Sequence, residues 1–162
     1  MNRWETLVQQ IAEVLRTRRL GPLVFARWVW QSATPLAQLP PKLACLLELL
    51  SQWMQQPAET MTMVRSDDGR DVTLIVTLRP SATAVITHLA NEPAHQTVPR
   101  ENAWSPEYPR PVGLDLFLLG TQGAIHLDGT QADWPHQPLL VPDLPAGHPV
   151  RARVERLWQG NQ

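Results

Sequence analysis

Cysteine, lysine and charge in general are scarce in this sequence. The 162 residues include one cysteine, Cys45, and one lysine, Lys42, and only 18% of the residues are charged. A single cysteine excludes an internal disulfide and a metal site made of several thiolates. Because Cys45 lies in the apolar run "KLACLLELL", we expect its thiol to pack as a small hydrophobic group rather than to act as a nucleophile.

The sequence also lacks an excess of positive charge. Its 14 basic and 15 acidic residues leave a net charge of -1 at pH 7, whereas nucleic-acid binding requires a concentrated basic surface. The basic cluster of Arg16, Arg18 and Arg19 falls at the end of an expected helix, where cations complement the helix dipole. We therefore predict no nucleic-acid partner, and keep binding through these three arginines only as an alternative.

Long apolar runs are absent as well. No stretch approaches the roughly 18 uninterrupted apolar residues of a membrane-spanning helix. The N-terminus, "MNRWETLVQQ", carries no apolar core of a signal peptide. These absences predict a cytoplasmic protein without a membrane span.

Motifs for cofactors, metals and catalysis are missing too. The eight glycines form no phosphate-binding loop, dinucleotide-binding pattern or nucleophile elbow, and the histidines show no metal-ligand spacing. His126 and Asp128 in "HLD" alternate along an expected strand and could share one face, but no third partner accompanies them. We thus predict no cofactor, no metal, no catalytic residue and no enzymatic activity.

Two amphipathic helices are expected in the first part of the chain. The first covers about 3–19, where large side chains follow the spacing of one helix face. The second covers about 41–55, begins with Pro41 at a favoured first position and carries leucines along one side. Both apolar stripes require a further surface on which to pack.

The segment between these helices, "PLVFARWVWQS" from Pro22 to Ser32, is ambiguous. Valine, phenylalanine and tryptophan favour a strand, whereas Pro22 at a helical first position and the helical neighbours favour a helix. We predict a short helix here. Because nearly every position is apolar, we expect one of Trp28 and Trp30 to be left uncovered.

After Pro57 the pattern changes to strands. Two β-rich runs around an Asp-Gly turn predict a hairpin over about 60–80. A third strand is expected over 82–89, a second hairpin over 113–129, and a last strand over 148–158. The alternation of apolar and polar residues in these runs predicts an antiparallel sheet with one solvent-exposed face.

These elements together predict an α+β fold. An N-terminal helical layer of two to three helices packs on an antiparallel β-meander or sandwich of about five to six strands. The helical layer covers 1–56, and the antiparallel β region, with its long proline-rich loops, covers 57–162. Both parts form one compact domain.

Two proline-rich loops, over 90–112 and 133–147, supply aromatic candidates for binding. Proline keeps such segments extended and reduces the entropy lost on binding, and tryptophan, tyrosine and arginine are the usual interface hot spots. The predicted partner-binding residues are Trp28, Trp30, Trp104, Tyr108, Arg110 and Trp134. The alternative is that the loops fold back and use these rings to cover the sheet.

Low charge, many tryptophans and missing catalytic motifs favour a non-enzymatic protein–protein interaction or assembly module. Such an adaptor would bind another protein or associate with itself through its aromatic and proline-rich surfaces. The alternative hypothesis is a small-molecule-binding sensor or a small enzyme with a pocket between the sheet and the helices. Its polar groups would be His126, Asp128 and His136.

Overall fold

A computed structural model describes residues 3–90, 114–128 and 140–160. The elements follow one another as α1 (Arg3–Arg16), β1 (Leu23–Ser32), the 3-10 turn η1 (Leu36–Gln38), α2 (Leu39–Met54), β2 (Ala58–Arg65), β3 (Val72–Leu78), β4 (Ala82–Ala90), β5 (Leu114–Gly120), β6 (Ala124–Asp128) and α3 (Pro149–Gly160). The predicted α+β class is confirmed, and so are both helices expected near the N-terminus.

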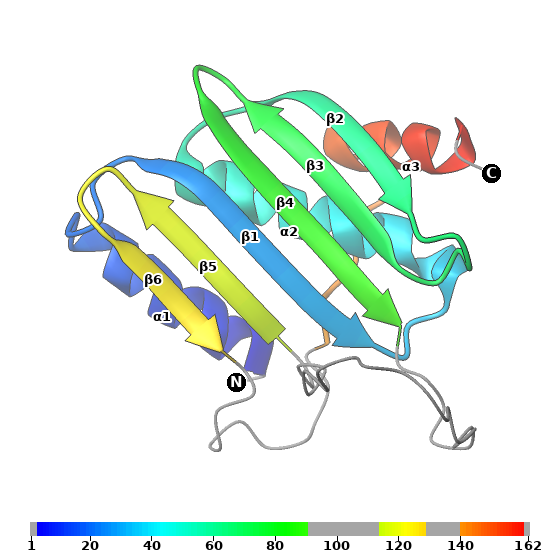
Figure 1. Cartoon of the computed structure of the whole chain (residues 1–162), viewed down its shortest axis with the longest axis horizontal. Helices are drawn as coiled ribbons and strands as arrows, with labels where there is room; N and C mark the ends of the chain where they lie inside the picture. Colours follow the sequence, from blue (N-terminus) through cyan, green and yellow to red (C-terminus); the bar gives the residue numbers. More distant parts are fainter. Residues whose placement is uncertain (1–2, 91–113, 129–139, 161–162) are drawn as a thin grey trace, which may run out of the picture.

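The strands form one sheet in the order β2-β3-β4-β1-β5-β6. Neighbouring strands are antiparallel, except that β1 and β4 run parallel. The sheet is therefore mixed, which corrects the purely antiparallel sheet that the sequence predicts. Parallel neighbours need a crossover connection, and the path from β1 through α2, β2 and β3 to β4 supplies it (Figure 1).

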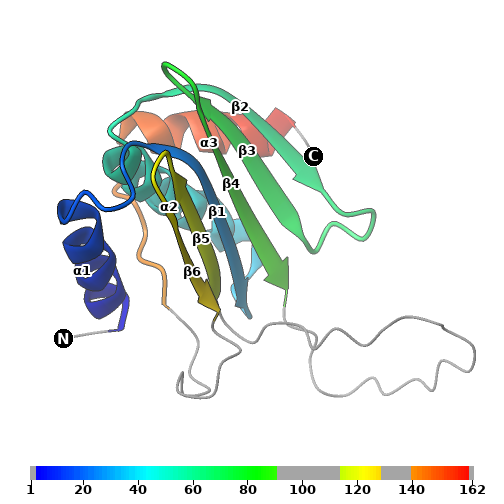
Figure 2. The ribbon, with the colours of Figure 1, turned by 60° about the vertical axis from the view of Figure 1, so that its left-hand side comes forward.

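The helices of the described chain lie on one face of the sheet, and the opposite face carries no described helix (Figures 1 and 2). Between the two layers lies the apolar core. Its fully buried members come from α2 and from every second position of the inner strands, and include Leu43, Leu46, Leu47, Leu50, Leu74, Val76, Ile86, Leu116 and Leu118. Burial of these side chains is the main driving force of the fold.

Strand β1 corrects the helix predicted for 22–32. It lies inside the sheet, between β4 and β5. Ala26, Trp28 and Trp30 are buried on the helix side, while Phe25 and Val29 are half-buried on the other side. A strand inside a sheet can be apolar on both faces, so the nearly continuous apolar run fits a strand and needs no helical stripe.

Helix α3 corrects the last strand predicted over 148–158. Val154 and Trp158, four residues apart, are both buried, whereas Ala152 is exposed although a strand would have buried it beside Val154. Arg151 Nε also donates to Glu155 Oε1 at 2.6 Å, an i,i+4 ion pair of a helix surface. The segment reads as a strand because it alternates apolar residues with charge, but its buried positions follow helical spacing.

Both predicted hairpins are confirmed. Gly69 closes the first with φ +69, a conformation that glycine adopts without steric cost. The second joins β5 to β6, where Gly120 N donates to Gly123 O at 2.8 Å. Its turn packs on the linker before β1, because Gln122 N donates to Leu20 O at 2.9 Å.

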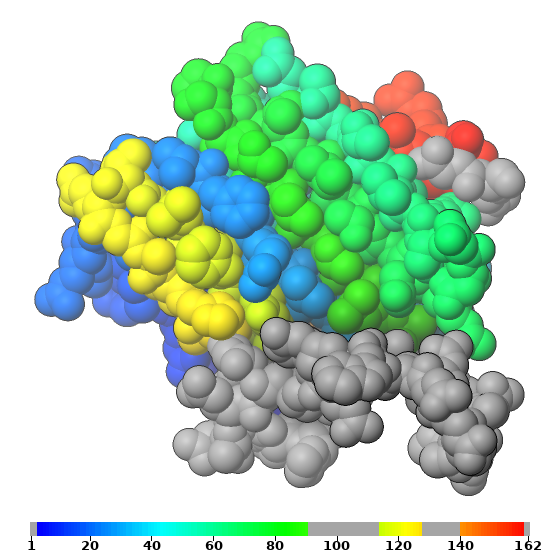
Figure 3. Space-filling view, viewed as in Figure 1, coloured from blue at the N-terminus to red at the C-terminus, as the bar shows by residue number. Residues whose placement is uncertain are grey.

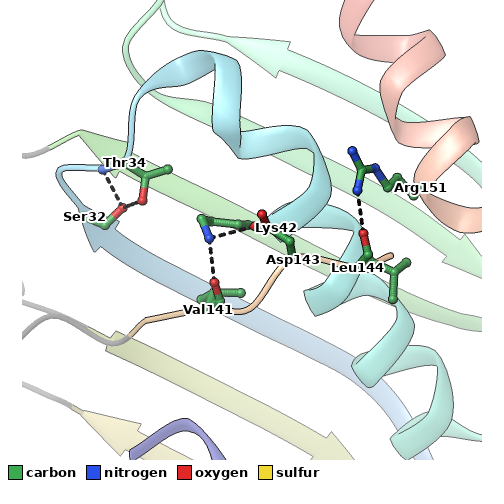
Figure 4. Close-up of polar contacts among 7 residues, drawn as sticks. All are labelled: Ser32, Thr34, Lys42, Val141, Asp143, Leu144 and Arg151. Carbon is green, nitrogen blue, oxygen red and sulfur yellow. Dashed lines mark hydrogen bonds and ion pairs between the residues drawn. The ribbon is translucent and has the colours of Figure 1, made fainter. Parts of the chain in front are cut away.

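A segment without helix or strand, residues 140–148, connects to α3 along α2 (Figure 4). Lys42 Nζ donates to the Val141 carbonyl oxygen at 2.8 Å and pairs with Asp143 at 2.8 Å. At the other end, Arg151 Nη1 donates to the Leu144 carbonyl oxygen at 2.8 Å. Lys42 thus holds the segment 140–148 against α2. Arg151 joins the other end of this segment to α3.

Replacement of Gly120 by alanine should destabilise the protein. A Cβ at this position would meet the Leu20 carbonyl oxygen at 2.1 Å, and that oxygen already accepts a hydrogen bond from Gln122 N. We expect Gly120→Ala to lower the free energy of unfolding by about 3 kcal/mol, the scale of a severe overpacking, as measured by urea denaturation. Gly160→Ala is the control, because nothing lies within 4 Å of its added Cβ. Equal stability of the two variants would contradict this account.

Candidate functional site

The two tryptophans predicted to bind a partner are core residues. Trp28 is 0% and Trp30 1% exposed, and the Trp28 ring lies 5.8 Å from Trp4 and 6.2 Å from Trp53. The expectation that one of them is left uncovered is wrong, because the helices cover both. The other predicted binding residues, Trp104, Tyr108, Arg110 and Trp134, lie outside the described residues.

His126 lies on the open face of the sheet, away from the helices. Its Nε2 lies 3.4 Å from Asp115 Oδ1, and Arg27 Nη2 donates to the same oxygen at 3.1 Å. The register places Asp128 opposite Asp115, while His136 lies outside the described residues. Groups on this face cannot line a pocket between the sheet and the helices, so His126 is not at the position predicted for it.

A groove lies where the C-terminal end of α2 meets α3 and the start of β2. We call it the corner groove, and its volume is about 380 Å³. Its lining residues are Glu48, Ser51, Gln52, Gln55, Gln56, Pro57, Ala58, Val150 and Arg153. A second groove of about 630 Å³ continues from Arg153 along the edge of β2 and α3.

The local backbone explains why glutamines gather in the corner groove. Gln55 ends α2 in the left-handed conformation, with φ 54. The Gln56 N–H then donates to the Ser51 carbonyl oxygen at 3.1 Å, a helix-terminating arrangement. This turn places consecutive amide side chains at the end of the helix, just before Pro57 leads the chain into β2.

The charged groups of the corner groove are already engaged. Glu48 Oε1 accepts from Gln52 Nε2 at 3.0 Å. Arg153 donates to the carbonyl oxygens of Ala58 and Glu59, both at 2.9 Å, and so covers backbone acceptors at the start of β2. The groove therefore offers a ligand a largely apolar surface together with amide and hydroxyl side chains, which both donate and accept hydrogen bonds.

Two polar atoms of the corner groove are buried without a hydrogen-bond partner in the described part of the chain. They are Ser51 Oγ and Gln56 Oε1. Buried polar atoms are nearly always paired with protein, water or ligand. Both residues line the groove, but these two atoms are shielded from solvent, so they lie in its wall and not on its open surface.

Sequence reasoning missed this site because its residues carry no recognisable motif. "SQWMQQPA" contains Ser51, Gln52, Gln55 and Gln56, yet amides have no diagnostic spacing and do not titrate. Arg153 joins them only because α3 packs beside β2. The run of glutamines before Pro57 was the available signal.

Burial favours the neutral forms of two titratable groups, the partly buried Cys45 and the buried His88. Burial raises the pKa of Cys45 to about 11, so its thiol is not a nucleophile at neutral pH, as the sequence suggests. Burial also lowers the pKa of His88, more strongly than the nearby Asp71 charge and the backbone hydrogen bond of Ser32 raise it.

No protein-family profile matches this sequence, and no curated protein matches it. Solved structures do resemble it. They include apo scyllo-inositol dehydrogenase from Lactobacillus casei (TM-score 0.54, 8% identity, 77% of this chain and 38% of that chain) and a probable dehydrogenase from Thermotoga maritima (0.51, 12%, 78% and 39%). A third is myo-inositol dehydrogenase from Lactobacillus casei in complex with NAD(H) and myo-inositol (0.50, 10%, 74% and 35%).

These similarities establish a shared fold, and the chain spans less than two fifths of the length of each of these dehydrogenases. They overturn the prediction of a non-enzymatic adaptor or assembly module, because the fold is one that dehydrogenases contain. The prediction that the protein is not an enzyme is corrected on the same ground. The small-molecule alternative agrees better with these neighbours.

The described residues do not fit a dinucleotide of the NAD(H) type. Such cofactors bind where a glycine-rich turn after a strand presents the N–H groups of a helix N-terminus to the pyrophosphate. Here the connection from β1 to α2, residues 33–38, contains no glycine. Helix α2 then has Pro40 and Pro41 in its first turn, and proline lacks the N–H donor. We therefore assign no cofactor to this helix.

The lowered pKa of His88 predicts a loss of stability in mild acid. Below the ordinary histidine pKa of 6.5, the unfolded chain binds a proton that the folded protein does not. The free energy of unfolding therefore decreases as the pH is lowered through this range. Urea unfolding at about pH 7.5 and about pH 5.5 measures this difference. His88→Gln should reduce the pH dependence. If the variant and the wild type lose the same stability, the acid sensitivity arises elsewhere.

Proposed function

We propose that this chain is a small-molecule-binding domain of an oxidoreductase-type protein, and that the corner groove binds a neutral, polyhydroxylated ligand. The lining of the groove includes the hydroxyl side chain of Ser51 and the amide side chains of Gln52, Gln55 and Gln56. Alcohol groups both donate and accept hydrogen bonds, as these side chains do. This gathering of one hydroxyl and three amide side chains in the lining is the observation that carries the proposal.

The fold neighbours support this choice of ligand class. Two of them are named as inositol dehydrogenases, and one was solved with myo-inositol. Inositol is a neutral ring with a hydroxyl group on each carbon, so it matches a groove whose charged residues, Glu48 and Arg153, already hydrogen-bond to neutral groups of the protein. The dinucleotide does not fit the described residues, so on this proposal the chain provides the substrate side of the reaction.

Titration calorimetry with myo-inositol tests the proposal directly. We expect saturable binding by the wild type and binding weaker by roughly 2- to 10-fold in Ser51→Ala and in Gln56→Ala, because one hydrogen bond contributes about 0.5–1.5 kcal/mol. Gln9→Ala is the matched control, since Gln9 is an exposed amide on α1, outside the groove.

The result can also exclude the groove. If the wild type binds neither myo-inositol nor a panel of other cyclic polyols, the proposed ligand class is wrong. If binding is present but equal in Ser51→Ala, Gln56→Ala and Gln9→Ala, the ligand binds elsewhere.

A second copy of the chain is the partner that we propose for the open face of the sheet (Figure 3). Its strands present apolar side chains there, including Ile75, 40% exposed, and Leu119, 37% exposed. Arg27 pairs with Asp115 on this face, so a two-fold contact between copies would bury these two charges as a pair. No helix within 3–90, 114–128 and 140–160 is long and apolar enough to cross a membrane. The cytoplasmic location stays a prediction from the sequence.

Sedimentation velocity tests this association. Ile75→Lys places a charge in the middle of the open face and should convert a dimer to a monomer. Val14→Lys is the control, because Val14 is also 40% exposed but lies on α1. A monomeric wild type, or a dimer that survives Ile75→Lys, would rule out the open face as the contact.

A further inference from the structure

The second groove adjoins the corner groove, because Arg153 lines both of them. It lies between the edge strand β2 and helix α3, which run beside each other (Figures 1 and 2). Residues 59–61 of β2 form one wall, and Arg153, Arg156 and Leu157 of α3 form the other. Its volume of about 630 Å³ falls within the range of small-molecule sites, roughly 300–1,000 Å³.

The lining of the second groove carries more positive than negative charge. Its carboxylate, Glu59, is paired with Arg79, whose Nε donates to Glu59 Oε1 at 3.2 Å. Arg153 donates only to neutral backbone carbonyls, and Arg156 Nε donates to the Ala152 carbonyl of its own helix at 3.4 Å. Neither of these two arginines forms an ion pair within the described residues. They lie one helical turn apart, so two positive charges without an acidic partner there face one groove.

The contacts of Arg153 also restrict what can bind beside β2. A peptide that added a strand to this edge would pair with its outward backbone groups. Arg153 already occupies two of them, the carbonyl oxygens of Ala58 and Glu59, each at 2.9 Å. Arg156, by contrast, is exposed, and its two terminal nitrogens donate to no group in the described part of the chain. The groove therefore fits a compact anionic group better than an added strand.

We propose that the second groove binds the phosphate group of a phosphorylated polyol, with Arg156 as its hydrogen-bond donor and Arg153 as a second positive charge. A guanidinium group presents paired N–H donors that match phosphate oxygens. A phosphate monoester carries about −1.5 to −2 charge at pH 7, which balances two arginines better than one carboxylate does. The neutral ring of the ligand lies in the adjoining corner groove. Only this placement of the ring rests on the function proposed above.

Titration calorimetry with myo-inositol monophosphate, myo-inositol and inorganic phosphate tests the phosphate site. We expect the monophosphate to bind roughly 10-fold more tightly than myo-inositol, the gain from one hydrogen bond to a charged group. Arg156→Gln should remove this gain and leave the affinity for myo-inositol unchanged, because Arg156 does not line the corner groove. Arg19→Gln is the matched control, since it removes the same charge from an exposed position between α1 and β1.

Failure of the phosphate site and failure of the corner groove give different results. If myo-inositol binds but the monophosphate binds no more tightly, or if Arg156→Gln and Arg19→Gln lose the same affinity, the phosphate site is wrong. If both phosphates bind through Arg156 and myo-inositol does not bind, the phosphate site is supported and the corner groove is excluded as a site for neutral polyols. Equal affinities for inorganic phosphate and the monophosphate would overturn the polyol phosphate as the ligand class.

Discussion

Burial of the β1 tryptophans is the interaction on which the rest of the fold depends. The Trp28 ring contacts Trp4 of α1 and Trp53 of α2, so one side chain joins both N-terminal helices to the sheet. An indole is a large apolar group whose removal from water contributes strongly to folding. Only a strand inside the sheet, covered by helices, keeps Trp28 and Trp30 dry together. The position of β1 and the one-sided helical layer follow from this requirement.

The one-sided layer also explains where function can lie. Helix α3 packs beside the edge strand β2, where Arg153 covers two backbone carbonyls and Arg65 lies over the Trp158 ring at 4.1 Å. Such contacts protect the edge of the sheet from pairing with other chains. They also bring α3 against the end of α2, which creates the corner groove. The opposite face of the sheet carries no described helix, and Arg27 pairs with Asp115 there.

The fold and the groove give separate indications about this chain. The fold resembles parts of solved dehydrogenases, while the groove combines an apolar surface with amide and hydroxyl side chains. The proline-rich start of α2 separates this chain from dinucleotide-binding domains, because Pro40 and Pro41 remove N–H donors that a pyrophosphate needs.

Local patterns in the sequence by themselves determined the two N-terminal helices, both hairpins and the α+β class, because amphipathic periodicity and turn chemistry act within a few residues. They also indicated that the Cys45 thiol packs as an apolar group and is not a nucleophile. Only the tertiary structure decided that residues 23–32 form a strand, that 149–160 form a helix and that β1 runs parallel to β4. Those choices depend on which surface each segment covers. The corner groove shares this origin, since its residues meet only when distant elements pack together.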